Sequence, residues 1–197
     1  MACVTAGVKP ELTLRWAALL HDIGKIPTFT RDETGQGHFY GHAGVGAQMA
    51  GEALRRLRAP AALTQKAVEL IANHMLRLEP DKKLLRRQIS RRGFETVDML
   101  LELQEADMGS KGTGNENEVA VFPDIRRVLE EIQAENAALC LKDLTVDGND
   151  LKALGYTGRQ IGGALHAALD AVLDERIVNK KAPLLDWICR ELPRSEK

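Results

Sequence analysis

The chain has 197 residues, 44% of them hydrophobic, which is enough for one large domain with a filled core or for one domain with a small annex. Charged residues make up 28% of the sequence but nearly cancel to a net charge of -1, which excludes a whole-molecule field that attracts nucleic acid or membrane. Three cysteines without CxxC spacing argue against a disulfide framework. No apolar run reaches the roughly 20 residues that cross a bilayer. We therefore expect a cytoplasmic protein without a membrane partner.

Helical periodicity dominates the sequence, and no convincing alternating strand is found, so the sequence predicts an all-α fold. Polar segments with glycine at 26–41 and 109–122 are expected to be surface loops. Near the C-terminus, apolar residues recur at helical spacing and predict a face that packs on a core. These residues are Ile161, Leu165, Leu169, Val172 and Leu173. The expected helices span residues 12–22, 44–58, 61–75, 82–91, 94–107, 123–140, 148–154, 158–174 and 182–192.

An adjacent histidine and aspartate follow the first long apolar run, in the segment "LLHDIGKIP" at residues 19–27. A carboxylate beside an imidazole suits Fe, Mn, Zn, Co or Ni and is too rich in nitrogen for Ca²⁺. Gly24 lets backbone approach such a site, and Lys25 offers a cation for a phosphate oxygen. A histidine at a helix end is also commonly a cap or a core residue. His21 and Asp22 by themselves leave both interpretations open.

Further candidate ligands follow at long separations. His42 stands at the start of an expected helix, His74 ends the apolar segment "VELIANHM", and Asp107 lies near the end of "LLELQEADMGSKG". Helix ends in a bundle can direct side chains into one cavity. Taken singly, His74 is also explained as a helix cap and Asp107 as a solvated carboxylate.

This combination resembles the HD superfamily of metal-dependent phosphohydrolases, in which "HDIGK" agrees especially well. The matching residues are His21, Asp22, His42, His74 and Asp107. The resemblance implies an all-helical core that holds one or two divalent ions, with Mn, Ni, Fe, Co, Zn and Mg as candidates. It also implies a metal-activated hydroxide as nucleophile and catalytic roles for Asp22 and Lys25 on a phosphate substrate.

The sequence departs from the family pattern before the His-Asp pair. The family's first histidine normally precedes that pair by one helix and a turn, but residues 1–20 contain no histidine. Cys3 and Glu11 are the other candidate ligands in this segment. Either the chain is part of a longer protein that carries the missing ligand, or its metal site lacks it.

A narrower resemblance comes from longer segments. "LRWAALLHDIGK", "GHFYGHAGVGAQMAGEALRRLRAP" and "VELIANHM" are similar to the HD region of bacterial tRNA nucleotidyltransferases of the CCA-adding and poly(A) polymerase family. "LTVDGNDLKALGYTGRQIGGALHAALDAVL" is similar to the C-terminal segment of the same proteins. The resemblance implies an HD-type domain at 1–110, a loop and connecting helix at 111–140, and a tRNA-binding tail at 141–197.

The family also implies a nucleotidyltransferase head in a longer parent chain. Such a head needs a Gly-Ser turn and a strand with paired carboxylates for two Mg²⁺ ions. Here Gly109 and Ser110 are followed by "KGTGNENE". We therefore expect that this chain does not transfer nucleotides by itself.

The segment "KKLLRRQISRR" is the strongest candidate for contact with RNA. On a helix its cations stack at i, i+4 and form a stripe able to follow phosphates, although a solvated charged face is the alternative. The candidate RNA-binding residues are Lys82, Lys83, Arg86, Arg87, Arg91 and Arg92.

Two functions of different classes follow from these patterns. The first is an RNA-binding body and tail that holds tRNA or another RNA. The second is a metal-dependent phosphohydrolase that acts on nucleotides, 2′,3′-cyclic phosphates or RNA 3′ ends through His21, Asp22 and Asp107.

Overall fold

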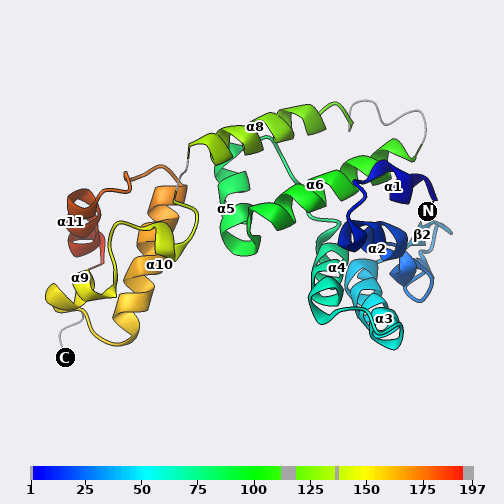
Figure 1. Cartoon of the computed structure of the whole chain (residues 1–197), viewed down its shortest axis with the longest axis horizontal. Coiled ribbons are helices and arrows are strands. Elements are labelled where there is room, and N and C mark those ends of the chain that lie inside the picture. The colour runs from blue at the N-terminus through cyan, green and yellow to red at the C-terminus, as the bar shows by residue number, and fades with distance from the viewer. Residues whose placement is uncertain (1, 112–118, 136–137, 193–197) are drawn as a thin grey trace. The chain divides into compact units, whose positions relative to one another are not determined.

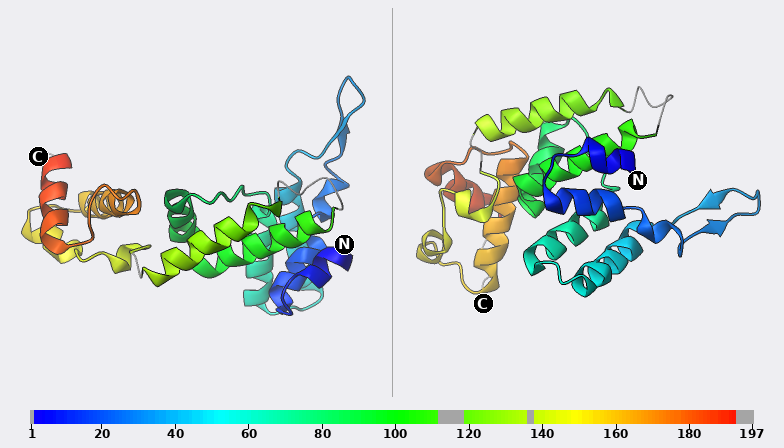
Figure 2. Two further views of the ribbon diagram at one scale, coloured as in Figure 1. Left: turned by 90° about the horizontal axis from the view of Figure 1, so that it is seen from above. Right: turned by 45° about the vertical axis from the view of Figure 1, so that its right-hand side comes forward.

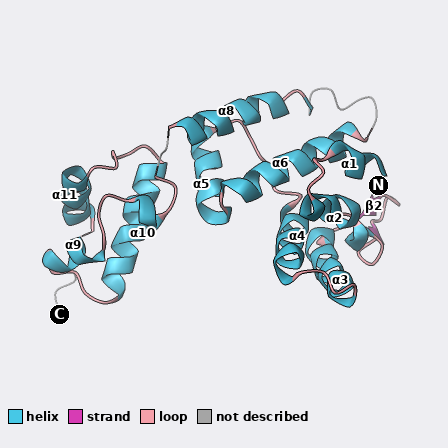
Figure 3. Cartoon of the chain, in the orientation of Figure 1, coloured by secondary structure: helices cyan, strands magenta, loops and turns pink. Residues whose placement is uncertain are grey.

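The computed structural model describes residues 2–111, 119–135 and 138–192, and it confirms the all-α fold (Figures 1 and 3). The strands found in these ranges form one short antiparallel hairpin, β1 (Thr30–Arg31) with β2 (Gly37–His38). No helix within the described ranges has the length and apolar character needed to cross a membrane.

The chain divides into two compact units, which are interleaved in sequence. The first takes in residues 1–79 and 94–125, and the second takes in 80–93 and 126–197. Residues 80–93 therefore pack with the C-terminal part, although they lie inside the range 1–110 expected for an HD-type domain. The division into domains at 110 and 140 stays a prediction.

The first unit is a helical bundle with the hairpin attached. Its helices pack around large buried side chains that include Leu14, Leu54, Leu70 and Leu100. Gly24 lies so close to the third helix that a Cβ atom would meet the His42 carbonyl oxygen at 2.1 Å, so only glycine fits there. The elements are α1 (Ala2–Gly7), α2 (Leu12–Leu20), the 3₁₀ turn η1 (Ile23–Lys25), α3 (His42–Arg56), α4 (Ala61–Asn73) and α6 (Phe94–Gly109).

The second unit has its own hydrophobic core, which packs around helix α10 (Arg159–Leu173). The predicted apolar face of this helix is confirmed, since Leu169 and Leu173 are buried and Ile161 packs against the same cluster. The Tyr156 hydroxyl closes the end of the core by donating to the Leu192 carbonyl oxygen at 2.7 Å. The elements are α5 (Lys82–Arg92), α8 (Phe122–Ala134, which begins in the first unit), the turn η2 (Leu141–Asp143), α9 (Gly148–Ala153), α10 (Arg159–Leu173) and α11 (Lys181–Glu191).

The structure differs from the expected elements mainly in the segment 26–41. It contains the hairpin, because the Asp32 carboxylate accepts hydrogen bonds from the Thr34 and Gln36 amides and closes the turn. Gly35 supplies a φ of 83° in this turn. The helix expected at 123–140 ends at Ala134, and residues 136–137 lie outside the described part of the chain.

Candidate metal centre

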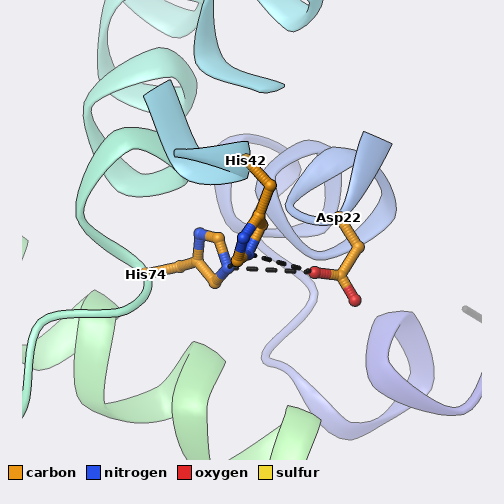
Figure 4. A group of neighbouring side chains, drawn as sticks. All are labelled: Asp22, His42 and His74. Atoms are coloured by element: carbon orange, nitrogen blue, oxygen red, sulfur yellow. Dashed lines mark hydrogen bonds and ion pairs between the residues drawn. The ribbon is translucent and has the colours of Figure 1, made fainter. Parts of the chain in front are cut away.

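Three helix ends of the first unit bring the predicted ligands together. His21 and Asp22 directly follow α2, His42 begins α3, and His74 directly follows α4. Asp22, His42 and His74 each offer a ligand atom, and these atoms all lie within 4.8 Å of one another (Figure 4). The Asp22 Oδ1 atom lies 3.8 Å from His42 Nε2 and 3.9 Å from His74 Nε2. The three helix ends therefore form a compact set of nitrogen and oxygen donors.

The backbone fixes all three imidazole rings in the same way. His21, His42 and His74 each place Nδ1 at 2.7 to 2.9 Å from the carbonyl oxygen of the residue three positions earlier. The Nε2 atoms of His42 and His74 lie 3.2 Å from each other. If each Nδ1 carries the proton, these Nε2 atoms present lone pairs that one cation can share, which is how metal-binding histidines are commonly oriented. Their Nε2 atoms face the Asp22 side of the cluster.

Asp107, from α6, is not one of these three close ligands and approaches the centre through His21. Its Oδ1 atom lies 3.5 Å from His21 Nε2, and Asp22 Oδ2 lies 3.3 Å from the same nitrogen. His21 Nε2 is buried and has no hydrogen bond of good geometry. An imidazole nitrogen buried between two carboxylates is costly unless it carries a proton or binds a cation. This geometry fits a divalent metal ion.

Two lysines border the centre. Lys25 Nζ lies 2.7 Å from Asp22 Oδ2, and Lys111 Nζ lies 2.8 Å from Asp107 Oδ2. Both lysine side chains are partly exposed, so they can also reach oxygens of a bound anion. The centre therefore combines metal-ligand side chains with cations that suit phosphate.

The pKa shifts favour a protonated His21 between two ionised carboxylates, beside a neutral His74. Burial lowers the pKa of His21, but the carboxylates of Asp107 and Asp22 outweigh burial and raise this pKa to about 9. Although burial raises the pKa of Asp22, His21 and Lys25 hold it well below its usual range. His21 lowers the pKa of Asp107 to about 2. Burial lowers the pKa of His74, which favours its neutral, ligating form.

A cavity of about 620 Å³ opens beside His21, His74 and Asp107. Gln104 lines it and donates hydrogen bonds to the carbonyl oxygens of His74 and Leu76, so it fixes the chain just after α4. Gln104 was not among the residues singled out from the sequence, although its position one helical turn before Asp107 on α6 was a usable signal. A small phosphate-bearing molecule fits a cavity of this size.

Neither alternative ligand before the His-Asp pair is shown to join the centre. The Glu11 carboxylate caps α2 by accepting from the amides of Thr13 and Leu14. The Cys3 side chain lies outside the described side chains.

The basic segment on α5 divides into two groups. Arg86 is buried and pairs with Glu135 and Glu175, and Lys82 also pairs with Glu135. Arg87 pairs with Asp174 at 2.7 Å. Lys83 and Arg91 are exposed, and Arg92 bonds to Gln88. Three of the six predicted cations thus hold α5 against other parts of the second unit.

A groove of about 940 Å³ in the second unit contains cations that α5 alone does not supply. Arg91 from α5, Lys142 from η2 and His166 from α10 line it, together with Arg176 and the ion pair of Arg87 with Asp174. Lys142, His166 and Arg176 are distant in sequence from α5, which is why the pattern at 82–92 did not reveal this groove.

Comparisons with known proteins find a matching family and several relatives of this chain. The HD domain family matches residues 1–109. The A-adding tRNA nucleotidyltransferase of Deinococcus radiodurans is 36% identical over 82% of this chain and 38% of its own length. The CC-adding tRNA nucleotidyltransferase of Thermus thermophilus is 33% identical over 90% of this chain and 41% of its own length.

A multifunctional CCA protein of an Azoarcus species is 34% identical over 54% of this chain and 27% of its own length. The chain thus spans about two fifths of the length of the first two relatives. No solved structure matches the chain significantly.

Proposed function

The chain belongs to the HD domain family, and from this premise we propose that it is the HD-type body and tail of a tRNA nucleotidyltransferase-like protein. In this proposal it binds tRNA and contributes to tRNA processing, and it does not transfer nucleotides by itself. The observation that carries the proposal is the extent of the similarity. It covers the HD region and also the tail, in two relatives that both act on tRNA by name.

The groove of the second unit is the proposed contact with the tRNA backbone. Its cations come from α5, η2 and the turn after α10, so they form a surface rather than a single stripe. Arg91 and Lys142 appear in no ion pair of the described residues, whereas Arg86 does. Of the six residues predicted on α5, Arg91 is therefore the best placed to meet a phosphate, with Lys83 and Arg92 as further candidates.

Binding of tRNA to the purified chain, measured by fluorescence anisotropy across a salt series, tests this proposal. Each phosphate contact contributes about one unit to the slope of log affinity against log salt. The double variant Arg91→Ala/Lys142→Ala should therefore lower this slope by about two. The matched control is Lys152→Ala, which removes an exposed lysine of the same unit that lies outside the groove. An unchanged slope in the double variant would exclude the groove as the tRNA contact.

A second candidate function is phosphohydrolysis at the candidate metal centre. The cavity lined by His21 and Asp107, with Asp22 beside His21, favours it. His21, Asp22, His42, His74 and Asp107 would hold the metal, which would supply a Lewis acid and an acidified water for attack on phosphorus. Lys25 and Lys111 would bind and orient the phosphate oxygens, and Gln104 would keep His74 in place.

Assays with 2′,3′-cyclic nucleotides and phosphomonoesters, in the presence of Mn²⁺ or Ni²⁺, test this second function. Activity that disappears in Asp22→Ala and survives in Arg91→Ala would assign hydrolysis to the centre. Metal-loaded chain without activity on either substrate class would reject it.

A further inference from the structure

The hairpin beside the metal centre exposes an unusual number of aromatic rings. Phe29 is 46% exposed, Phe39 38% and Tyr40 76%, in a chain whose aromatic content is only 4%. We name residues 29–40 the aromatic hairpin. In Figure 2 its two strands extend away from the helices of the first unit. Large exposed rings gathered in one place commonly mark a binding surface.

The rings are held in fixed pairs. Phe29 and Phe39 lie 5.5 Å apart, and His38 stacks on Tyr40 at 5.1 Å with only 11° between the planes. Phe29 covers Gly37 so closely that a Cβ atom there would meet the ring at 2.6 Å. The His38 ring is also held by Asp32, which lies 2.8 Å away. These contacts present flat faces in a defined arrangement before any ligand binds.

The aromatic hairpin is continuous with the metal centre. The Phe39 carbonyl oxygen accepts the bond from Nδ1 that orients His42, one of the candidate ligands. Lys25 Nζ lies 5.8 Å from the centre of the Phe39 ring and 2.7 Å from Asp22 Oδ2. One lysine thus joins an exposed ring to a carboxylate of the centre. A ligand with an aromatic part and a phosphate could contact both at once.

We propose that the aromatic hairpin binds unpaired nucleobases at the 3′ end of an RNA, with the adjoining phosphate directed toward Lys25 and the metal centre. The bases stack on Tyr40 and its neighbouring rings, which accept any base because every base has a π face. Cations over Phe29 and Phe39, from Arg31 and Lys25, suit a phosphate-bearing ligand better than an aliphatic partner. This proposal rests on the proposed function, because it assumes that the chain binds RNA.

The test compares two RNA stem-loops with the same stem. One has a blunt end, and the other has a short single-stranded 3′ end. Tyr40→Ala removes the most exposed ring, and Tyr40→Phe keeps the ring without the hydroxyl. Ile26→Ala removes an 86% exposed aliphatic side chain next to the same surface and serves as the control for general hydrophobic contact. Affinities are measured by fluorescence anisotropy, and self-association by sedimentation velocity.

The proposal predicts that the wild-type chain binds the tailed RNA more tightly than the blunt one. Tyr40→Ala should raise the Kd for the tailed RNA about tenfold and leave the Kd for the blunt RNA unchanged. Tyr40→Phe and Ile26→Ala should resemble the wild type. A 2-aminopurine base near the 3′ end should be quenched on binding to the wild type and less so on binding to Tyr40→Ala.

Several results would overturn the proposal. Equal wild-type affinity for the two RNAs, no effect of Tyr40→Ala, or an equal loss in Ile26→Ala would each show that the rings do not read unpaired bases. Self-association that depends on Tyr40 would assign the surface to a second copy of the chain. If the folded wild type binds neither these RNAs nor tRNA, the proposed function itself fails, whereas binding of tRNA without any role for Tyr40 rejects only the aromatic hairpin.

Discussion

The candidate metal centre of the first unit and the basic helix α5 of the second show how differently polar residues can be used. In the centre, three histidines are buried, and their rings are fixed by backbone carbonyl oxygens. On α5, Arg86 is equally buried but is held by two carboxylates of its own unit. Buried imidazoles whose Nε2 atoms lie near carboxylate oxygens can bind an added cation together with these oxygens. A buried guanidinium that is already paired stabilises the fold.

The largest expected effect comes from Asp22, which faces all three histidines. Asp22→Ala removes the carboxylate whose two oxygens lie near His21 on one side and near His42 and His74 on the other. We expect loss of Mn²⁺ affinity by more than about 100-fold, since loss of supporting groups alone costs about 10- to 100-fold. Isothermal titration measures this. Glu131→Ala, which removes an exposed carboxylate paired with Arg127 in the second unit, should leave Mn²⁺ affinity unchanged.

The affinity of the centre for metal should depend on pH through His21. Because the pKa of His21 is raised to about 9, His21 must release a proton before it binds a metal. Apparent metal affinity should therefore rise by up to about tenfold per pH unit between pH 7 and 9 and level off above. In the metal-free chain the sign is opposite, because protonated His21 stabilises the fold below its unfolded pKa and this contribution is lost as the pH rises through about 9. Metal affinity that does not change over this range would contradict the assignment of His21 as a ligand.

Arg86 and Arg91 lie on the same helix, and we expect Arg86 to stabilise the fold through ion pairs and Arg91 to contact tRNA. Arg86→Ala removes a buried cation with two carboxylate partners and should lower the free energy of unfolding of the second unit by about 2 kcal/mol. Arg91→Ala should change stability by less than about 0.5 kcal/mol and weaken tRNA binding. Denaturant unfolding and tRNA titration of both variants decide this. If Arg86→Ala weakens tRNA binding more than Arg91→Ala while the chain remains folded, the two roles are reversed.

The residues of the candidate metal centre could be proposed from the sequence because they match the HD pattern and stand at or near helix ends. Apolar periodicity located the helices, and the structure places His21 and His74 directly after two of them and His42 at the start of a third. What the sequence did not reveal is which atoms face one another. That depends on the i−3 carbonyl contacts of the imidazoles and on the packing of Gly24 against α3.

The basic surface and the hairpin were less predictable. The charges at 82–92 were visible, but the carboxylates that pair with them come from Glu135, Asp174 and Glu175, which lie far away in sequence. The strands of the aromatic hairpin have two residues each, too few to show alternation. Their pairing is fixed by the side chain of Asp32, whose contacts appear only once the chain is folded.

The most direct test of the central claim, that the His and Asp residues of the first unit form a metal site, is the metal content of the purified chain. The chain is incubated with Mn²⁺ or Ni²⁺, desalted and submitted to elemental analysis. We expect near-stoichiometric metal in the wild type, retained through desalting. A folded wild-type chain that retains no metal would contradict it and would leave tRNA binding as the function to pursue.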